Sequence, residues 1–434
     1  MLALLALSAV LSTAPAAGVP VSSGTAPAAA AQDISGDEPA PSTTAQAPVA
    51  LSAQTTTAVT APETPPSSVP AAATEKKDGK TAARKEPEPD PDIASSVAIS
   101  SGPAMRAVHL TAWVAGAPKS RRAFLDKLKG TVVNTVVVPL KETDGRVYVP
   151  GVKSAAEYGT YEAAIPDPEA LLRDLRAQNL KAVARIVVFR DELLSRKHPE
   201  WAVRNPEGGV WRNQNRAAWM DPYRKVVWDY NLDLAVRAAE LGFDEIQFDY
   251  IRFPTEGNTR ACRYVRSDHS RNSAISNLVE FLRHARRRID PTGKPISIAV
   301  FGMTTTSKDD MGIGQEIDRL APLVDYISPM MYPSHYYKGE YGLASPNREP
   351  YKIIHRGLRD AKSRLKEQAP KLRPYLQDFS LFGVRYGPQQ VKAQILAAHL
   401  QGVESWILWN ASNNYTWSVL TPQYLGLPPT TSAQ

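Results

Sequence analysis

From Met105 onward the chain alternates short apolar runs with helix patterns, and this alternation limits the fold more than any other feature. Eight strand-like runs cover residues 106–113, 134–141, 181–189, 243–251, 296–302, 324–332, 373–379 and 403–410. Amphipathic segments such as PEALLRDLRAQNL lie between them, and several begin after Pro or end at Gly, as helices commonly do. Eight strands that alternate with helices predict an α/β fold of the (β/α)8 TIM-barrel type.

A doubly wound parallel sheet is the alternative fold for such an alternation. That fold commonly carries a Gly-rich phosphate-binding loop directly after its first strand. No Gly-rich loop follows residues 106–113. The sequence therefore favours the barrel.

The part of the chain before the barrel has a different composition. Residues 1–17 form an apolar run with Ala14-Pro15-Ala16 near its end, which resembles a signal peptide without a positive n-region. Residues 18–104 are rich in Ala, Pro, Thr and Ser and contain no aromatic residue, so we expect a disordered linker. We predict a barrel domain over residues 105–425 and a flexible tail over 426–434. Such a layout predicts export and association with the cell envelope through the linker.

Charge and cysteine content exclude several classes of protein. The net charge is +7, but Lys and Arg are spread along the chain, and the densest cluster (283–290) falls on a helix pattern. We therefore expect no nucleic-acid partner. The single cysteine, Cys262, excludes an internal disulfide and a cysteine-based zinc site. The scattered histidines predict no metal site, and we expect a monomer without a cofactor.

In a TIM barrel the active site lies at the carboxyl ends of the strands. Carboxylates, amides and aromatic rings gather at these ends, and such a set suits a sugar, because rings stack on pyranose faces and carboxylates do acid–base or nucleophilic work. We expect the substrate to be bound by Trp113, Lys141, Glu142, Arg252, Met330, Tyr332, Gln377, Trp409 and Asn410. Three tryptophans after the third strand, Trp201, Trp211 and Trp219, are expected to form a wall of the cleft.

The fourth run, GFDEIQFDYIRFP, is unusually polar for a buried strand. Glu245, Gln247 and Asp249 alternate in it with Ile246, Phe248 and Tyr250. Side chains alternate across a strand, so we expect the apolar set to face the helices and the polar set to face the barrel interior. Asp249 then points into the mouth of the barrel, either as a catalyst or as an ion-pair partner of Arg252 or Arg185. We favour catalysis.

Several motifs occur in order along the barrel segment. They are MDP (220–222), GFDEIQFDYIRFP (242–254), SPMMYPSHY (328–336), YLQDF (375–379) and SWILWNASNNY (405–415). With these motifs the chain resembles the putative glycoside hydrolase domain family over residues 105–425. The resemblance implies a TIM barrel that acts on a polysaccharide or glycoconjugate, without defining the substrate.

A more distant similarity connects the fourth strand with chitinases that carry D-x-x-D-x-D-x-E. In this chain the pattern falls on Asp244, Gln247, Asp249 and Ile251. Ile251 stands where those enzymes have the proton donor, so the chain is not expected to be a chitinase.

Glycoside hydrolysis normally needs two carboxyl groups. Asp249 is the first candidate, and for the second we rank Asp378 before Asp191 and Glu142. The sequence thus predicts a glycosidase of an extracellular or envelope polysaccharide. Because the fourth and fifth strands lack a donor, a non-catalytic glycan-binding barrel is the alternative.

Overall fold

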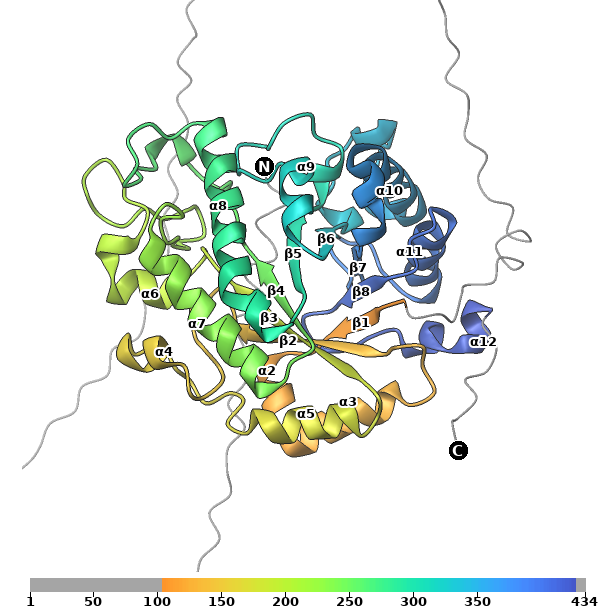
Figure 1. Cartoon of the computed structure of the whole chain (residues 1–434). Coiled ribbons are helices and arrows are strands. Elements are labelled where there is room, and N and C mark those ends of the chain that lie inside the picture. The colour runs from red at the N-terminus through yellow and green to blue at the C-terminus, as the bar shows by residue number, and fades with distance from the viewer. Residues whose placement is uncertain (1–103, 427–434) are drawn as a thin grey trace, which may run out of the picture. The chain divides into compact units, whose positions relative to one another are not determined.

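The computed structural model describes residues 104–426, which form a closed barrel of eight parallel strands in sequential order (Figure 1). The strands are β1 (Arg106–His109), β2 (Thr135–Lys141), β3 (Lys181–Val187), β4 (Glu245–Asp249), β5 (Ile296–Phe301), β6 (Tyr326–Met330), β7 (Tyr375–Gln377) and β8 (Trp406–Trp409). The barrel prediction is therefore confirmed, and all eight strands lie within the predicted runs. The signal-like segment, the linker up to residue 103 and the tail from 427 lie outside the described residues.

Helices surround the barrel on its outer side (Figure 1). They are α2 (Ala112–Gly116), α3 (Pro118–Leu128), α4 (Lys153–Glu157), α5 (Pro168–Arg176), α6 (Glu192–Lys197), α7 (Lys225–Leu241), α8 (Arg271–Ile289), α9 (Ile317–Leu320), α10 (Pro350–Leu365), α11 (Pro388–Leu400) and α12 (Pro422–Leu425). Local signals set their ends: α8 begins with a capping box between Ser270 and Ser273, and α7 ends at Gly242, whose φ of 97° suits glycine. No helix among residues 104–426 is long and apolar enough to cross a membrane.

The alternation of side chains along β4 agrees with the prediction at five positions. Ile246 and Phe248 belong to the large core between the strands and the helices. On the interior face, Glu245 pairs with Arg373 at 2.7 Å, and Gln247 accepts a hydrogen bond from the Tyr375 hydroxyl. Asp249 also lies inside, as the next section describes.

The prediction is wrong for Tyr250. This residue has a φ of 52°, because the chain turns sharply as soon as β4 ends. Its side chain consequently lines two cavities at the barrel mouth, although its ring also packs partly against the outer core. Strict alternation stops where the strand stops.

The end of β2 contains an irregularity that matters for the site. The register between β2 and β3 shifts between Pro139 and Lys141, and proline cannot donate to the ladder. Leu140 lies in the outer core, and Lys141 also turns to that side, where its Nζ donates to Asn231 Oδ1 on α7 at 3.1 Å. The side chain of Glu142 therefore points toward the barrel interior.

Candidate active site

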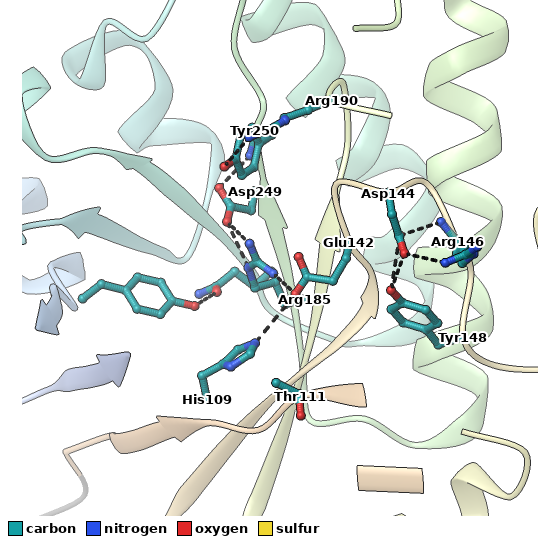
Figure 2. A network of polar contacts seen from close by, with 12 residues as sticks. His109, Thr111, Glu142, Asp144, Arg146, Tyr148, Arg185, Arg190, Asp249 and Tyr250 are labelled. Carbon is teal, nitrogen blue, oxygen red and sulfur yellow. Dashed lines mark hydrogen bonds and ion pairs between the residues drawn. The ribbon is translucent and has the colours of Figure 1, made fainter. Parts of the chain in front are cut away.

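Two carboxylates meet one guanidinium at the carboxyl ends of neighbouring strands (Figure 2). Arg185 on β3 donates from Nη1 to Glu142 Oε1 at 2.7 Å, and from Nε and Nη2 to Asp249 Oδ2 at 2.9 and 2.6 Å. The Tyr250 backbone N–H donates to the other Asp249 oxygen at 2.6 Å. The ion-pair partner of Asp249 is therefore Arg185, whereas Arg252 pairs with Glu256 at 3.1 Å.

The two carboxylates lie in different electrostatic surroundings. Burial raises the pKa of Glu142; Arg185 opposes that shift, and the negative charges of Asp249 and Asp144 add to it. Asp249 has three N–H donors on its two oxygens, two of them from Arg185, whereas Glu142 has a single contact with Arg185. Burial and the neighbouring negative charges thus raise the pKa of Glu142, whereas Asp249 receives the larger share of the hydrogen bonds from Arg185.

His109 lies beneath this group. It is buried, its Nε2 is 3.9 Å from Glu142 Oε1, and its ring centroid is 4.0 Å from that of Trp409. Burial and the charge of Arg185 lower its pKa well below the usual value. His109 is thus a neutral packing partner of the site.

Two adjoining cavities lie at the barrel mouth. The first, which we call the Asp249 cavity, has a volume of about 480 Å³ and is lined by Glu142, Asp249 and Trp409 among others. The second, the Glu256 cavity, has a volume of about 640 Å³. The two cavities share the side chains of Arg190, Tyr250, Met330 and Tyr332.

The structure brings five of the expected site residues besides Asp249 to these cavities. Glu142 and Trp409 line the Asp249 cavity, Arg252 lines the Glu256 cavity, and Met330 and Tyr332 line both. Trp113 lies after β1, more than half exposed, with its ring 6.5 Å from that of Tyr148.

Lys141 and Asp191 are brought together elsewhere. Lys141 Nζ is 2.7 Å from Asp191 Oδ2, and both side chains are fully buried. Asp191 also accepts a hydrogen bond from the Leu194 N–H at 2.7 Å and thereby caps α6. The pair lies on the helix side of β2 because of the bulge, and it has the geometry of a structural anchor.

The remaining predicted residues fix the chain after β7 and β8. Asp378 accepts hydrogen bonds from Thr416 N at 2.7 Å and Thr416 Oγ1 at 2.6 Å. Asn410 Nδ2 donates to the carbonyl oxygen of Asp378 at 2.5 Å. Gln377 is buried and donates to the carbonyl of Phe379 at 2.9 Å. These contacts hold the loops that frame the mouth.

The expectation for the three tryptophans is not met. Trp211 and Trp219 are buried in the outer core, and the Trp201 ring stacks on His198 at 3.8 Å. Trp219 contributes indirectly, since its ring lies 4.7 Å from the Arg252 guanidinium. The tryptophan rings of the long segment after β3 thus pack against neighbouring parts of the protein and do not form a wall of the cleft.

Several residues that line the Glu256 cavity were not predicted as site residues from the sequence. They include Arg190, Tyr250, Glu256, His335 and Tyr336. Arg185 had a visible signal, because a charge in the apolar run KAVARIV must face a partner. Glu256 follows β4 in an irregular loop, where no periodicity shows its direction. Among residues 104–426 there is no group of three metal-ligating side chains.

A family model described as "Putative glycosyl hydrolase domain" matches residues 107–415, which run from Ala107 on β1 to beyond the end of β8. The chain belongs to this family. The resemblance found in the sequence is thereby confirmed. No curated protein matches the chain.

Solved structures share the barrel fold. The glycoside hydrolase domain of PgaB (BpsB) from Bordetella bronchiseptica is 14% identical, with a TM-score of 0.52, and the match covers 76% of this chain and 100% of that one. α-L-fucosidase isoenzyme 2 from Paenibacillus thiaminolyticus is 14% identical, with a TM-score of 0.52, and the match covers 74% of this chain and 49% of that one. A hypothetical protein from Ruminiclostridium thermocellum ATCC 27405 is 33% identical over 44% of this chain and 96% of that one, with a TM-score of 0.40. The first two likenesses show a shared fold.

Proposed function

We propose that this protein hydrolyses a glycosidic bond of a polysaccharide or glycoconjugate in the Asp249 cavity. The observation that carries the proposal is a buried carboxylate, Asp249, beside a largely buried one, Glu142, whose side chain is 16% exposed, in one cavity at the carboxyl end of the barrel. This is the end at which TIM-barrel enzymes perform their chemistry. Family membership supports the reaction class.

The roles of the two carboxylates follow from their surroundings. Glu142, whose pKa burial raises, is the general acid that protonates the leaving oxygen. Asp249, hydrogen-bonded by Arg185 and the Tyr250 N–H, is the nucleophile or the base that activates water. One guanidinium and two carboxylates carry a net negative charge, so a proton on Glu142 leaves a balanced Arg185–Asp249 pair.

The spacing is compatible with this chemistry. Because both carboxylate oxygens are bonded to the same guanidinium, they lie no more than about 8 Å apart. Glycosidases place their two carboxyl groups about 5 Å apart for retention and roughly 6.5–9.5 Å apart for inversion.

The test is hydrolysis of a glycan panel that includes peptidoglycan, chitin, cellulose, starch and galactans. Wild type is expected to release reducing ends from at least one of them, while Asp249→Asn and Glu142→Gln lose most of that activity. Asp233→Asn, on the outer side of α7, is the control and should match wild type. Turnover that both site variants retain would refute the assignment.

A glycan-binding barrel without catalysis is the second candidate, and one observation favours it. Arg185 pairs with both carboxylates, as in a structural ion triad. On this reading Asp249 holds a sugar hydroxyl. Glycan binding without any turnover by wild type would select this candidate.

We further propose that the glycan lies outside the cytoplasm, in the cell envelope or beyond it. This proposal rests on the apolar run of residues 1–17 and on the Ala/Pro/Thr-rich segment that follows. Fractionation of cells with an antibody to the barrel tests it. Protein found only in the cytoplasm would contradict it.

A further inference from the structure

The Glu256 cavity gathers buried polar atoms that have no hydrogen-bond partner among the described residues. They are Glu256 Oε2, His335 Nε2 and the Tyr336 hydroxyl oxygen. Proteins satisfy almost all buried polar groups, so each unsatisfied atom requires an explanation. Three such side chains around one cavity indicate a ligand with several hydrogen-bonding groups.

Glu256 is held firmly and presents an acceptor. Its Oε1 accepts from Arg252 Nη2 at 3.1 Å, and Arg252 in turn donates to Thr255 Oγ1 at 3.1 Å. The Arg252 guanidinium lies between the rings of Trp219 and Tyr250, at 4.7 and 5.2 Å from their centroids. Burial acts to raise the pKa of Glu256, but the charges of Arg252 and Arg190 outweigh it and the pKa is lowered. The carboxylate is therefore ionised.

The opposite wall offers neutral hydrogen-bonding groups. His335 Nδ1 is 2.9 Å from Ser334 Oγ, and burial lowers the pKa of His335 to about 4, so the ring is neutral. Burial raises the pKa of Tyr336, so its hydroxyl stays protonated. Gly302 has no side chain and so leaves room beside this hydroxyl. A side chain at this position would also collide with the Met330 carbonyl.

The remaining lining is apolar or aromatic and includes Phe301, Met303, Met330 and Tyr332. An apolar ligand would leave the three polar atoms unsatisfied. A carboxylate-bearing ligand is not favoured either, because Arg252 is already paired with Glu256. A ring with an apolar face and hydroxyl groups along its edge fits both parts of the wall, and this describes a pyranose.

The Glu256 cavity is continuous with the proposed reaction site. Tyr250, Met330 and Tyr332 line both cavities, so a chain bound at Asp249 can extend past these side chains. We propose that the Glu256 cavity binds a second sugar ring of the same glycan, with Glu256 Oε2 accepting from a ring hydroxyl. This inference rests on the proposed function and makes the preferred substrate an oligosaccharide or polymer.

The experiment compares two substrates of different length. Cello-, chito- and malto-tetraose are paired with the 4-nitrophenyl monoglycosides of glucose and N-acetylglucosamine, which offer no second ring of hydroxyls. Glu256→Gln and Tyr336→Phe are expected to lower kcat/KM for the cleaved tetrasaccharide at least about tenfold, since a hydrogen bond to a buried charged or polar group is lost. Turnover of the monoglycoside should stay at the wild-type level. Glu240→Gln, an exposed position on α7, is the matched control.

Equal effects on both substrates, or none on either, would overturn the inference while leaving the hydrolase assignment intact. If wild type cleaves nothing, the proposed function fails, and calorimetry with the tetrasaccharides decides the second site separately. Weaker binding by Glu256→Gln than by Glu240→Gln then supports it. No binding by wild type, or equal binding by all three proteins, refutes it. Thermal unfolding of each variant confirms that the fold is retained.

Discussion

Arg185 lies at the centre of the candidate site (Figure 2). Its side chain is 5% exposed, and it pairs with both Glu142 and Asp249. Its charge opposes the rise in the pKa of Glu142 that burial causes, and the negative charge of Asp249 adds to that rise. Two predictions follow at the scale of single residues, one for Glu142 and one for Arg185 itself.

Replacing Glu142 by Gln should lower kcat about 10²- to 10⁴-fold, the usual contribution of a general acid. In wild type the donor is active only while protonated, so kcat/KM should fall as the pH rises through the raised pKa of Glu142. The variant should lack this alkaline limb. Glu162→Gln, a partly exposed partner of Arg146, serves as control. If kcat/KM of the variant still falls at alkaline pH, the fall is due to the titration of another group.

Replacing Arg185 by Met should destabilise the fold by about 3–5 kcal/mol at pH 7, because two buried carboxylates lose their cation. Burial raises the pKa of Glu142 and Arg185 opposes that shift, so without the cation the folded-state pKa of Glu142 lies further above its unfolded value and more stability is lost as the pH rises. The deficit relative to wild type should therefore shrink from pH 7 to pH 5. Urea unfolding at both pH values measures this, with Arg146→Met as exposed control. A deficit independent of pH would contradict the explanation.

At the scale of elements, the strands were predictable and the second carboxylate was not. Apolar runs identify the strands of a parallel barrel because helices cover them outside and side chains fill them inside. Alternation also placed Asp249 correctly, since β4 is regular up to that residue. The bulge after Pro139 depends on how β2 meets β3, so the sequence alone did not show that Lys141 turns outward and Glu142 inward. Asp191 and Asp378 ranked high as candidates for the second carboxyl group because each follows a strand. At such positions the alternation of the strand no longer determines where a side chain points.

The anchoring of α6 leads to a prediction for Asp191. Asp191→Asn leaves the fully buried Lys141 ammonium without its carboxylate and weakens the α6 cap, so we expect a loss of about 3–5 kcal/mol in unfolding free energy. Well below the unfolding temperature, kcat should remain close to that of wild type. Asp126→Asn, in an exposed pair with Lys129, should change neither quantity. If the Asp191→Asn protein folds but has no turnover, Asp191 is again a candidate catalytic residue.

At the scale of the whole molecule, the barrel closes through contacts between its first and last segments. Arg106 pairs in register with Trp406, and the Tyr415 hydroxyl donates to the carbonyl of His109. The family match, residues 107–415, lies entirely inside the described part. Every lining residue of both cavities also belongs to it. The barrel thus contains what it needs for folding and for the proposed chemistry.

We therefore predict that a fragment of residues 104–426 unfolds in one cooperative transition and keeps the kcat/KM of the full chain on a soluble oligosaccharide. A fragment of residues 104–404, which lacks β8, should not fold, because β1 and β7 would each lose a paired edge. Calorimetry and hydrolysis assays on the two fragments and the full chain measure the difference. If the longer fragment folds but loses turnover of the soluble oligosaccharide, residues outside the barrel take part in catalysis. If it turns over that oligosaccharide but fails on intact envelopes, the N-terminal segment provides access to the substrate and the barrel provides the chemistry.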